Sequence, residues 1–253
     1  MPTIPAMQNE HENEPELKDL PTLEPPGSIT IIGGGPLGIE AALYGRFLGY
    51  QVTLLEADQL VRSLRGRESD PIPMSPDRCA SPLAKNALMA QSSGGAPASG
   101  PVTIGDWIEQ VWLPLAQTDL LRGRVHEQTT VSRIEQVEVS DEETGEALPP
   151  DFRVLCNISS QDTAGQDTAS ELDFSDTEAV IVATGRTENA IELAFDLPQD
   201  YFFVIGNSLG EQTAGGEGSD AELEFWTGLK EIVAVYASLG GRADLDLYRP
   251  TRG

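Results

Sequence analysis

The chain has 253 residues, of which 39% are hydrophobic, so it can bury the core of one large domain or of two small ones. Its 16 Lys and Arg stand against 41 Asp and Glu, and the resulting net charge of −25 argues against nucleic acid and anionic membranes as partners. No apolar run reaches the roughly 18–20 residues of a membrane span, and the acidic N-terminus lacks the apolar core of a secretory signal. We therefore expect a cytoplasmic protein.

Few residues of the chain can bind a metal or carry thiol chemistry. Cys79 and Cys156 form no CxxC pair, and His11 and His126 are the only histidines. Too few imidazole and thiolate ligands are available for metal catalysis, so we predict no metal site. A dithiol mechanism is excluded because two neighbouring cysteines are required to pass electrons as a disulfide.

The predicted elements alternate between strands and helices. Residues 1–27 are rich in Glu, Pro and Asn and are predicted to form a disordered acidic leader. Polar, turn-rich stretches are predicted at 91–101, 140–150 and 159–171. The predicted strands are 28–32, 51–56, 134–139, 152–158, 178–183 and 201–205, and the predicted helices are 36–48, 104–121 and about 222–239. This alternation predicts an α/β fold with a Rossmann-like parallel sheet.

A glycine-rich turn follows the first predicted strand. Residues 28–58 read SITIIGGGPLGIEAALYGRFLGYQVTLLEAD, with Gly33, Gly35 and Gly38 in a G-x-G-x-x-G pattern and Glu56 at the end of the second strand. In a dinucleotide-binding turn the first glycine permits the sharp turn, the second lets a diphosphate approach the backbone, and the third lets the helix pack on the strand. The acid accepts hydrogen bonds from ribose hydroxyls. The predicted cofactor-binding residues here are Gly33, Gly34, Gly35, Pro36, Leu37, Gly38 and Glu56.

Three later motifs extend this pattern. An apolar strand ends in Ala183-Thr184-Gly185, another ends in Gly206-Asn207, and VSRI begins at Val131. Together with the glycine turn they resemble the FAD domain of the pyridine nucleotide-disulfide oxidoreductases and flavin monooxygenase-like proteins. The resemblance implies that FAD is the cofactor, with NAD(P)H as a candidate electron donor. It implies that the backbone of Val131 contacts adenine and that further cofactor contacts come from Thr184, Gly185, Gly206, Asn207, Thr227 and Gly228.

The chain departs from that family in two ways, of which the first bears on its expected domains. It has no second G-x-G-x-x-G turn, so a separate nicotinamide domain is missing, and Asn207 stands where the family has an aspartate. We expect one FAD/NAD(P)-binding domain over 28–240, with a helical insert at about 57–125 and an FAD-type three-stranded β-meander at about 125–176. Residues 241–253 are predicted to form a C-terminal tail.

The catalytic candidates lie in the insert PIPMSPDRCASPLAKNALMA. Cys79 is a possible reactive thiol, although free cysteines more often act as small buried apolar residues, and Arg78 is either an anion-binding group or a solvated loop charge. The cluster of Arg62, Arg65 and Arg67 either binds a 2′-phosphate or forms a solvated face.

Three functions remain open from the sequence. The first is an FAD-dependent oxidoreductase, in which the flavin carries the redox chemistry. The second is an NAD(P)-binding oxidoreductase, and the third is a degenerate dinucleotide-binding module without catalysis. The sequence does not identify a small-molecule substrate or redox partner.

Overall fold

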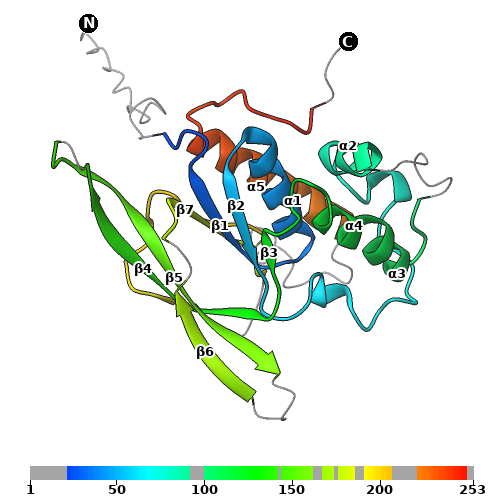
Figure 1. Cartoon of the computed structure of the whole chain (residues 1–253). Helices are drawn as coiled ribbons and strands as arrows, with labels where there is room; N and C mark the ends of the chain where they lie inside the picture. Colours follow the sequence, from blue (N-terminus) through cyan, green and yellow to red (C-terminus); the bar gives the residue numbers. More distant parts are fainter. Residues whose placement is uncertain are drawn as a thin grey trace, which may run out of the picture.

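The computed structural model describes residues 22–91, 100–141, 144–161, 167–173, 176–185, 191–206 and 221–249. These residues form three layers (Figure 1): a group of helices, a central parallel sheet, and a long, mainly antiparallel sheet on the opposite side. The predicted α/β class is confirmed.

The central sheet is parallel, with the strand order β3-β2-β1-β7-β9. Its strands are β1 (Ser28–Ile32), β2 (Gln51–Leu55), β3 (Val125–His126), β7 (Ala179–Val182) and β9 (Phe202–Val204). In the middle, β1 pairs with β2 on one side and with β7 on the other, so that Ile31 faces Leu54 and Ile181 in register. This Rossmann-like arrangement confirms the predicted sheet. Strands β1, β2, β7 and β9 begin and end within one residue of the bounds predicted from the sequence.

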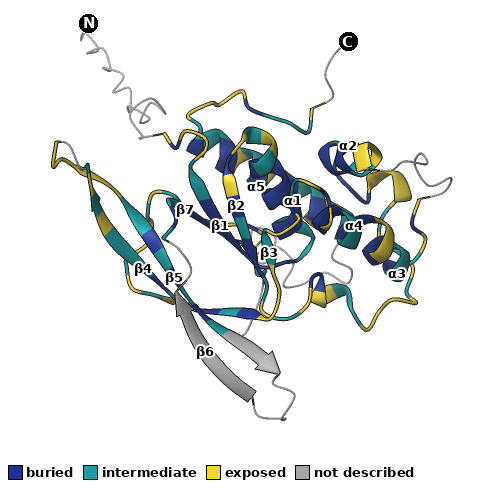
Figure 2. Ribbon diagram, in the orientation of Figure 1, coloured by how far each residue is buried: buried dark blue, intermediate teal, exposed yellow. Residues whose placement is uncertain are grey.

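Both faces of the central sheet are covered, which explains why its strands read as near-continuous apolar runs. Ile29 and Ile31 of β1 point into the core under the helices, whereas Ile32 points into a second core beneath the antiparallel sheet. Figure 2 shows these strands, and the helix faces that pack on them, as buried.

The helix layer is built on α1 (Pro36–Leu48) and α5 (Ala221–Leu239), which pack against each other. The Tyr236 ring of α5 stacks on Tyr44 of α1, with centroids 5.0 Å apart, and its hydroxyl donates to the Ala41 carbonyl oxygen at 2.8 Å. Helix α1 ends at Leu48 and is capped by Gly49, whose φ of 96° is left-handed, as expected for a glycine at a helix C-terminus.

The second sheet has the order β6-β5-β4-β8. Its strands are β4 (Thr129–Ser140), β5 (Ala147–Gln161), β6 (Asp167–Asp173) and β8 (Glu192–Leu193). Strands β4, β5 and β6 form the predicted antiparallel meander. The prediction that 159–171 is only turn-rich is wrong, because the ends of β5 and β6 pair there from Leu155–Asp173 to Gln161–Asp167.

Strand β5 is longer than predicted because its two prolines lie where no pairing is needed. The register with β4 shifts between Val137 and Val139, so Pro149 and Pro150 fall in the bulge between paired Leu148 and Asp151. Proline cannot donate to a ladder hydrogen bond and is tolerated at such bulges.

The insert folds as a cluster of short helices at one end of the helix layer. They are η2 (Arg62–Leu64), η3 (Pro76–Arg78), α2 (Pro82–Gln91), α3 (Ile104–Trp107), the π-helical η4 (Ile108–Trp112) and α4 (Leu113–Ala116). The regular helix predicted over 104–121 is therefore wrong in its middle and at its end. The Leu113 N–H reaches back to the Ile108 carbonyl oxygen, and this wider turn precedes Pro114, which has no N–H to donate.

The described structure begins before the first strand and continues beyond the last helix. Leu23 is buried, its N–H donates to the Leu239 carbonyl oxygen at 2.8 Å, and Tyr248 packs edge-on against Tyr44. Packing thus extends into the stretches predicted as leader and tail, although residues 1–21 lie outside the described part of the chain.

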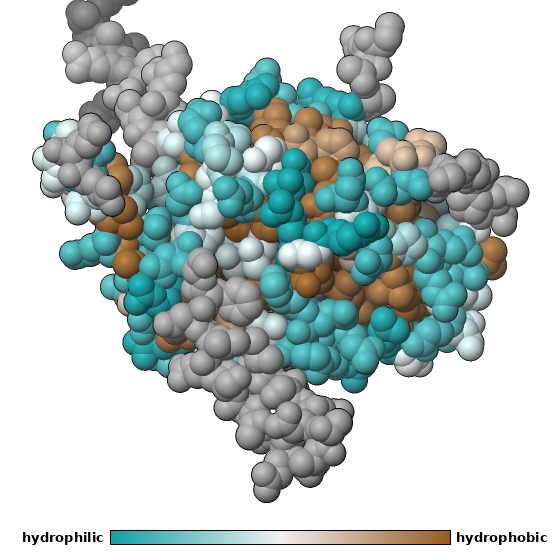
Figure 3. Space-filling view, viewed as in Figure 1, coloured by the Kyte–Doolittle hydropathy of each residue, from teal (hydrophilic) through white to brown (hydrophobic). Residues whose placement is uncertain are grey.

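None of the helices in the described ranges has the length and apolar character needed to cross a bilayer. In Figure 3 the visible surface is mainly hydrophilic, with apolar patches between.

Candidate functional site

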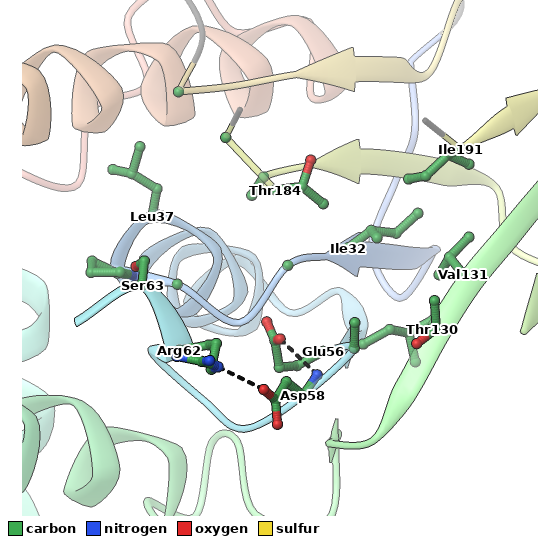
Figure 4. A pocket seen from close by; sticks show the side chains of 18 of the residues that line it. Ile32, Leu37, Glu56, Asp58, Arg62, Ser63, Thr130, Val131, Thr184 and Ile191 are labelled. Atoms are coloured by element: carbon green, nitrogen blue, oxygen red, sulfur yellow. Dashed lines mark hydrogen bonds and ion pairs between the residues drawn. The ribbon is translucent and has the colours of Figure 1, made fainter. Parts of the chain in front are cut away.

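A pocket of about 640 Å³ opens where β1, β2 and β7 end (Figure 4). The strand β4 and the first turns of α1 and α5 supply its other walls. It is lined by Ile32, Gly33, Gly35, Pro36, Leu37, Leu55, Glu56, Ala57, Asp58, Arg62, Ser63, Thr129, Thr130, Val131, Ala183, Thr184, Gly185, Ile191, Gly206 and Glu224. In open α/β sheets ligands bind at this edge, beyond the carboxyl ends of the strands.

Each glycine of the G-x-G-x-x-G turn has different surroundings. Gly33 has a φ of 111°, and a Cβ there would lie 2.7 Å from the Ala183 carbonyl oxygen. A Cβ on Gly38 would overlap the Gly33 carbonyl oxygen, whereas a Cβ on Gly35 would meet nothing within 4 Å. Gly33 and Gly38 are therefore required by packing. Gly35 instead leaves the backbone open to the pocket at the start of α1.

Glu56 is fixed against the glycine turn. Its Oε2 accepts the Gly34 N–H at 2.6 Å, and its Oε1 accepts the Asp58 N–H at 2.9 Å. A Cβ on Gly34 would lie 2.9 Å from the Glu56 Cβ, so the glycine also makes room for the acid. The carboxylate is thus held at the pocket wall, with lone pairs left for a ligand.

Beyond Glu56, a tight turn brings an ion pair to the pocket rim. Arg62 Nε lies 2.7 Å from Asp58 Oδ2, and both residues line the pocket. The turn is held by Val61, a buried residue with a left-handed φ of 53°, whose N–H donates to the Gly34 carbonyl oxygen at 2.9 Å. Such a backbone is strained for a β-branched residue and persists only where its surroundings fix it.

The opposite end of the pocket is formed by the ends of β7 and β9 and by α5. Thr184, Gly185 and Gly206 line it, and the Gly206 N–H donates to Glu231 Oε2 at 2.6 Å. Gly228 does not line the pocket, because it packs on the Leu37 side chain, where a Cβ would overlap. Thr227 is not among the lining residues either, and Asn207 lies outside the described residues.

The pocket therefore gathers most of the residues predicted from sequence. Gly33, Gly35, Pro36, Leu37, Glu56, Val131, Thr184, Gly185 and Gly206 line it, whereas Gly34 and Gly38 support the turn from behind. The sequence analysis missed Asp58 and Glu224. The sequence offered one signal for each residue. Asp58 is a charged residue just after a predicted strand, and Glu224 is a charged residue in the first turn of a predicted helix.

Neither catalytic candidate of the insert lines the pocket. The Cys79 side chain is buried, its thiol donates to the Pro76 carbonyl oxygen at 2.9 Å, and burial raises the pKa of this thiol. Arg78 forms an ion pair with Glu222 at 2.9 Å and lies over the Trp226 ring at 5.0 Å. Neither residue therefore suits a catalytic role: a thiol with a raised pKa is a poor nucleophile, and Arg78 is engaged by Glu222 of α5.

Comparison with known proteins identifies the fold. No protein-family model matches the chain, and neither does any curated protein sequence. THI4 from Thermovibrio ammonificans superposes with a TM-score of 0.53, at 12% identity, over 84% of this chain and 90% of that one. This likeness confirms a shared fold.

Two further solved structures match more loosely. Bacillithiol disulfide reductase from Bacillus cereus matches with a TM-score of 0.41 and 18% identity, over 63% of this chain. A steroid monooxygenase bound to NADP matches with a TM-score of 0.40 and 16% identity, over 67% of this chain. The chain spans only 40% and 28% of the lengths of these two proteins.

Proposed function

We propose that this protein binds FAD in the pocket at the carboxyl edge of its parallel sheet and acts as an FAD-dependent oxidoreductase. The observation that carries the proposal is the pairing of an open glycine turn with a fixed acid: Gly35 leaves backbone exposed to the pocket, and Glu56 is held beside it. The likeness to THI4 supports the fold alone.

From one end of the pocket to the other, the walls suit the successive parts of a dinucleotide. Val131 and Thr130 would flank the adenine, and Glu56 would accept hydrogen bonds from the adenosine ribose. The start of α1 at Gly35 would take the diphosphate, because the first N–H groups of a helix have no partners within it and carry a positive dipole end. Thr184, Gly185 and Gly206 would line the part beyond the diphosphate.

When bound, FAD would supply the electron transfer itself. The contribution of this chain is to hold and orient the cofactor and to shield one side of it from water. The lining residues in the described part of the chain have as ionisable groups only Glu56, Asp58, Arg62 and Glu224. A protein group that acts as acid or base on the substrate therefore has to be one of these four, or it has to lie outside this set of lining residues.

That small set of groups favours a second candidate, a dinucleotide-binding module without chemistry of its own. The specific observation is that Cys79 and Arg78 do not line the pocket and are engaged elsewhere. An NAD(P)-binding oxidoreductase remains an alternative on the same glycine turn, because that turn serves both kinds of dinucleotide.

The three functions separate in one set of measurements. We expect the purified protein to show the visible absorption of a flavin, or to acquire it on incubation with FAD, and mass analysis of the extract to identify FAD. Gly35→Val should abolish this uptake without unfolding the chain, since no atom lies within 4 Å of a Cβ there. Binding of NAD or NADP without flavin would favour the NAD(P)-binding oxidoreductase, and FAD binding without reduction by any donor would favour the module. A chain that takes up no dinucleotide would contradict the proposal.

A further inference from the structure

The acid of helix α1 is buried one turn behind the pocket. Glu40 has no exposed surface, and its neighbours in the chain, Ile39 and Ala41, are buried apolar residues. Pro36 and Leu37, four and three residues before Glu40, both line the pocket. Residues at these spacings are neighbours on one side of a helix. Glu40 therefore lies behind the part of the pocket wall that the start of α1 forms.

The usual structural reasons for an acid in a helix do not account for Glu40. It is the fifth residue of α1, beyond the first turn where a negative charge favours the helix dipole. Its carboxylate accepts the Ser81 N–H at 3.1 Å and the Ser81 hydroxyl at 2.7 Å, and the Tyr248 hydroxyl donates to it at 3.4 Å. These donors are neutral. An ionised carboxylate buried among neutral groups is costly, so this environment favours an acid that holds its proton.

The ionisable groups that face Glu40 come from each element packed around it. The charged group is Lys85 of α2, whose ammonium donates to the Asp77 carbonyl oxygen and whose charge favours an ionised Glu40. Burial raises the pKa of a thiol and three phenols above their usual 9 and 10: Cys79, Tyr44, Tyr236 and Tyr248. Farther out, the charges of Asp77, Arg242 and Asp246 act on Cys79 and Tyr44 rather than on Glu40. For Glu40 burial is the largest effect and raises the pKa to about 7, so Glu40 is the group in this cluster that changes charge near neutral pH.

An ionised Glu40 opposes the binding of an anion at the start of α1. Glu40 is five residues from the N-cap Gly35, about 7.5 Å along the helix axis, and the side chains of a helix lean towards its N-terminus. Gly38 and Ile39 between them are buried, and charges in buried protein are screened less than in water. A bound diphosphate would therefore raise the affinity of Glu40 for a proton. By reciprocity, a protonated Glu40 would raise the affinity of the site for the diphosphate.

We propose that Glu40 links dinucleotide binding to proton uptake: its carboxyl takes a proton from the solvent as the diphosphate occupies the start of α1. The proposal rests on the proposed function and adds to it a control by pH. At low pH Glu40 is protonated with or without ligand, and binding is tight. As the pH rises, the free protein loses this proton before the complex does, so the affinity for the dinucleotide falls.

Calorimetric titration of the full-length cofactor-free protein with FAD and with NAD tests this linkage. The diphosphate of either ligand stays ionised near neutral pH, so it adds no titration of its own. Titration at one pH in two buffers of different ionisation enthalpy counts the protons taken up. If the bound charge raises the proton affinity of Glu40 about tenfold, we expect uptake of about half a proton per ligand at about pH 7.5. The affinity itself should fall close to tenfold from about pH 5.5 to about pH 9.

Glu40→Gln is the decisive variant, because the amide keeps the shape of the side chain and cannot ionise. It should take up no proton, and at about pH 9 it should bind the dinucleotide about tenfold more tightly than the wild type. A merely structural role for Glu40 predicts weaker binding or none in this variant, not tighter binding. Glu109→Gln removes the same charge from an exposed position and should keep the wild-type pH profile.

Tyr248→Phe gives a second check that does not depend on the folding of Glu40→Gln. The Tyr248 hydroxyl stabilises the ionised form of Glu40, and the ring packs on Tyr44. Loss of the hydroxyl alone should move the fall in affinity to higher pH. A shift to lower pH, or none, would contradict the proposal.

Proton uptake that persists in Glu40→Gln would refute the proposal and assign the proton to another acid. A wild type that binds FAD or NAD without proton uptake would also refute it, and would leave the proposed function standing. A wild type that binds neither ligand at any pH would overturn the proposed function, and this inference with it.

Discussion

At the scale of single residues, Gly35 and Gly38 separate the structural part of the glycine turn from its binding part. The two positions lie within one helical turn, yet a Cβ at Gly38 would overlap a backbone oxygen while a Cβ at Gly35 would enter open space. A sequence pattern treats both glycines as one motif. Their surroundings indicate that a substitution at Gly38 will lower the stability of the fold, whereas one at Gly35 will weaken dinucleotide binding.

Gly38→Ala should destabilise the fold by about 3 kcal/mol, because the overlapping atom belongs to the backbone of the turn and cannot rotate away. Gly35→Ala should cost less than about 1 kcal/mol, as at a helix N-cap, and should weaken dinucleotide binding instead. Urea unfolding and ligand titration of both variants check the pair. Equal loss of stability at the two positions would contradict the assignment.

Glu40 is a second residue with an unusual environment. It is fully buried in α1, and its carboxylate accepts the Ser81 N–H at 3.1 Å and the Ser81 hydroxyl at 2.7 Å. Burial raises the pKa of this carboxyl from 4.5 to about 7, although the hydrogen bonds from Ser81 and Tyr248 and the charge of Lys85 lower it. The folded state therefore binds a proton more tightly here than the unfolded chain does.

This pKa predicts that stability falls as the pH rises from about 4.5 to about 7. Between those values the folded protein holds a proton that the unfolded chain has released, so the stabilisation is complete below the unfolded pKa and lost above the folded one. At about 1.4 kcal/mol for each tenfold change in proton affinity, roughly 3 kcal/mol is at stake. Urea unfolding from pH 5 to pH 8 should show a shallower decline for Glu40→Gln than for the wild type. The exposed Glu109→Gln is the control, and its profile should match the wild type.

At the scale of secondary structure, helix α2 depends on the same contact. The Ser81 hydroxyl accepts the Ala84 N–H at 3.0 Å and so caps the start of α2, while it donates to Glu40. The cap and the buried acid are therefore one unit that joins α2 to α1.

Ser81→Ala should lower the free energy of unfolding by more than about 1 kcal/mol, the usual cost of a lost cap, because Glu40 also loses a donor while it stays buried. Ser132→Ala is a suitable comparison, since its hydroxyl donates only to the Leu155 carbonyl oxygen at 3.1 Å and caps no helix. A loss at Ser81 no greater than at Ser132 would show that the link between α1 and α2 is weak.

The elements that the sequence predicts well are those with a local signal. The strand from Ser28 to Ile32, the glycine turn and α1 follow from residues close together in the chain, and the pocket walls at Glu56 and Thr184 follow from strand ends. The strand pairing across Pro149 depends on its register with β4, a separate segment of the chain. Glu224 was missed for the same reason, because its place over the pocket is set by the contact between Gly228 and Leu37.

At the scale of the whole molecule, the net charge of −25 opposes folding through repulsion among the acids. Ion pairs such as Arg67–Asp70 and Arg62–Asp58 are exposed and contribute little. We expect the melting temperature to rise by a few degrees as salt increases from about 0.01 M to about 0.1 M, because the screening length falls from about 30 Å to about 10 Å. Calorimetry in a neutral salt measures this shift. A fall over the same range would mean that attractive pairs outweigh the repulsion.

The order of strands in the central sheet has a consequence for synthesis on the ribosome. Strand β1 cannot complete its pairing until Ala179 has emerged, and α1 is covered only when Tyr236 has followed. A nascent chain that has already displayed the glycine turn still lacks the far walls of its pocket. Cofactor loading should therefore come after translation of α5, and until then the apolar strands that form first need protection from aggregation.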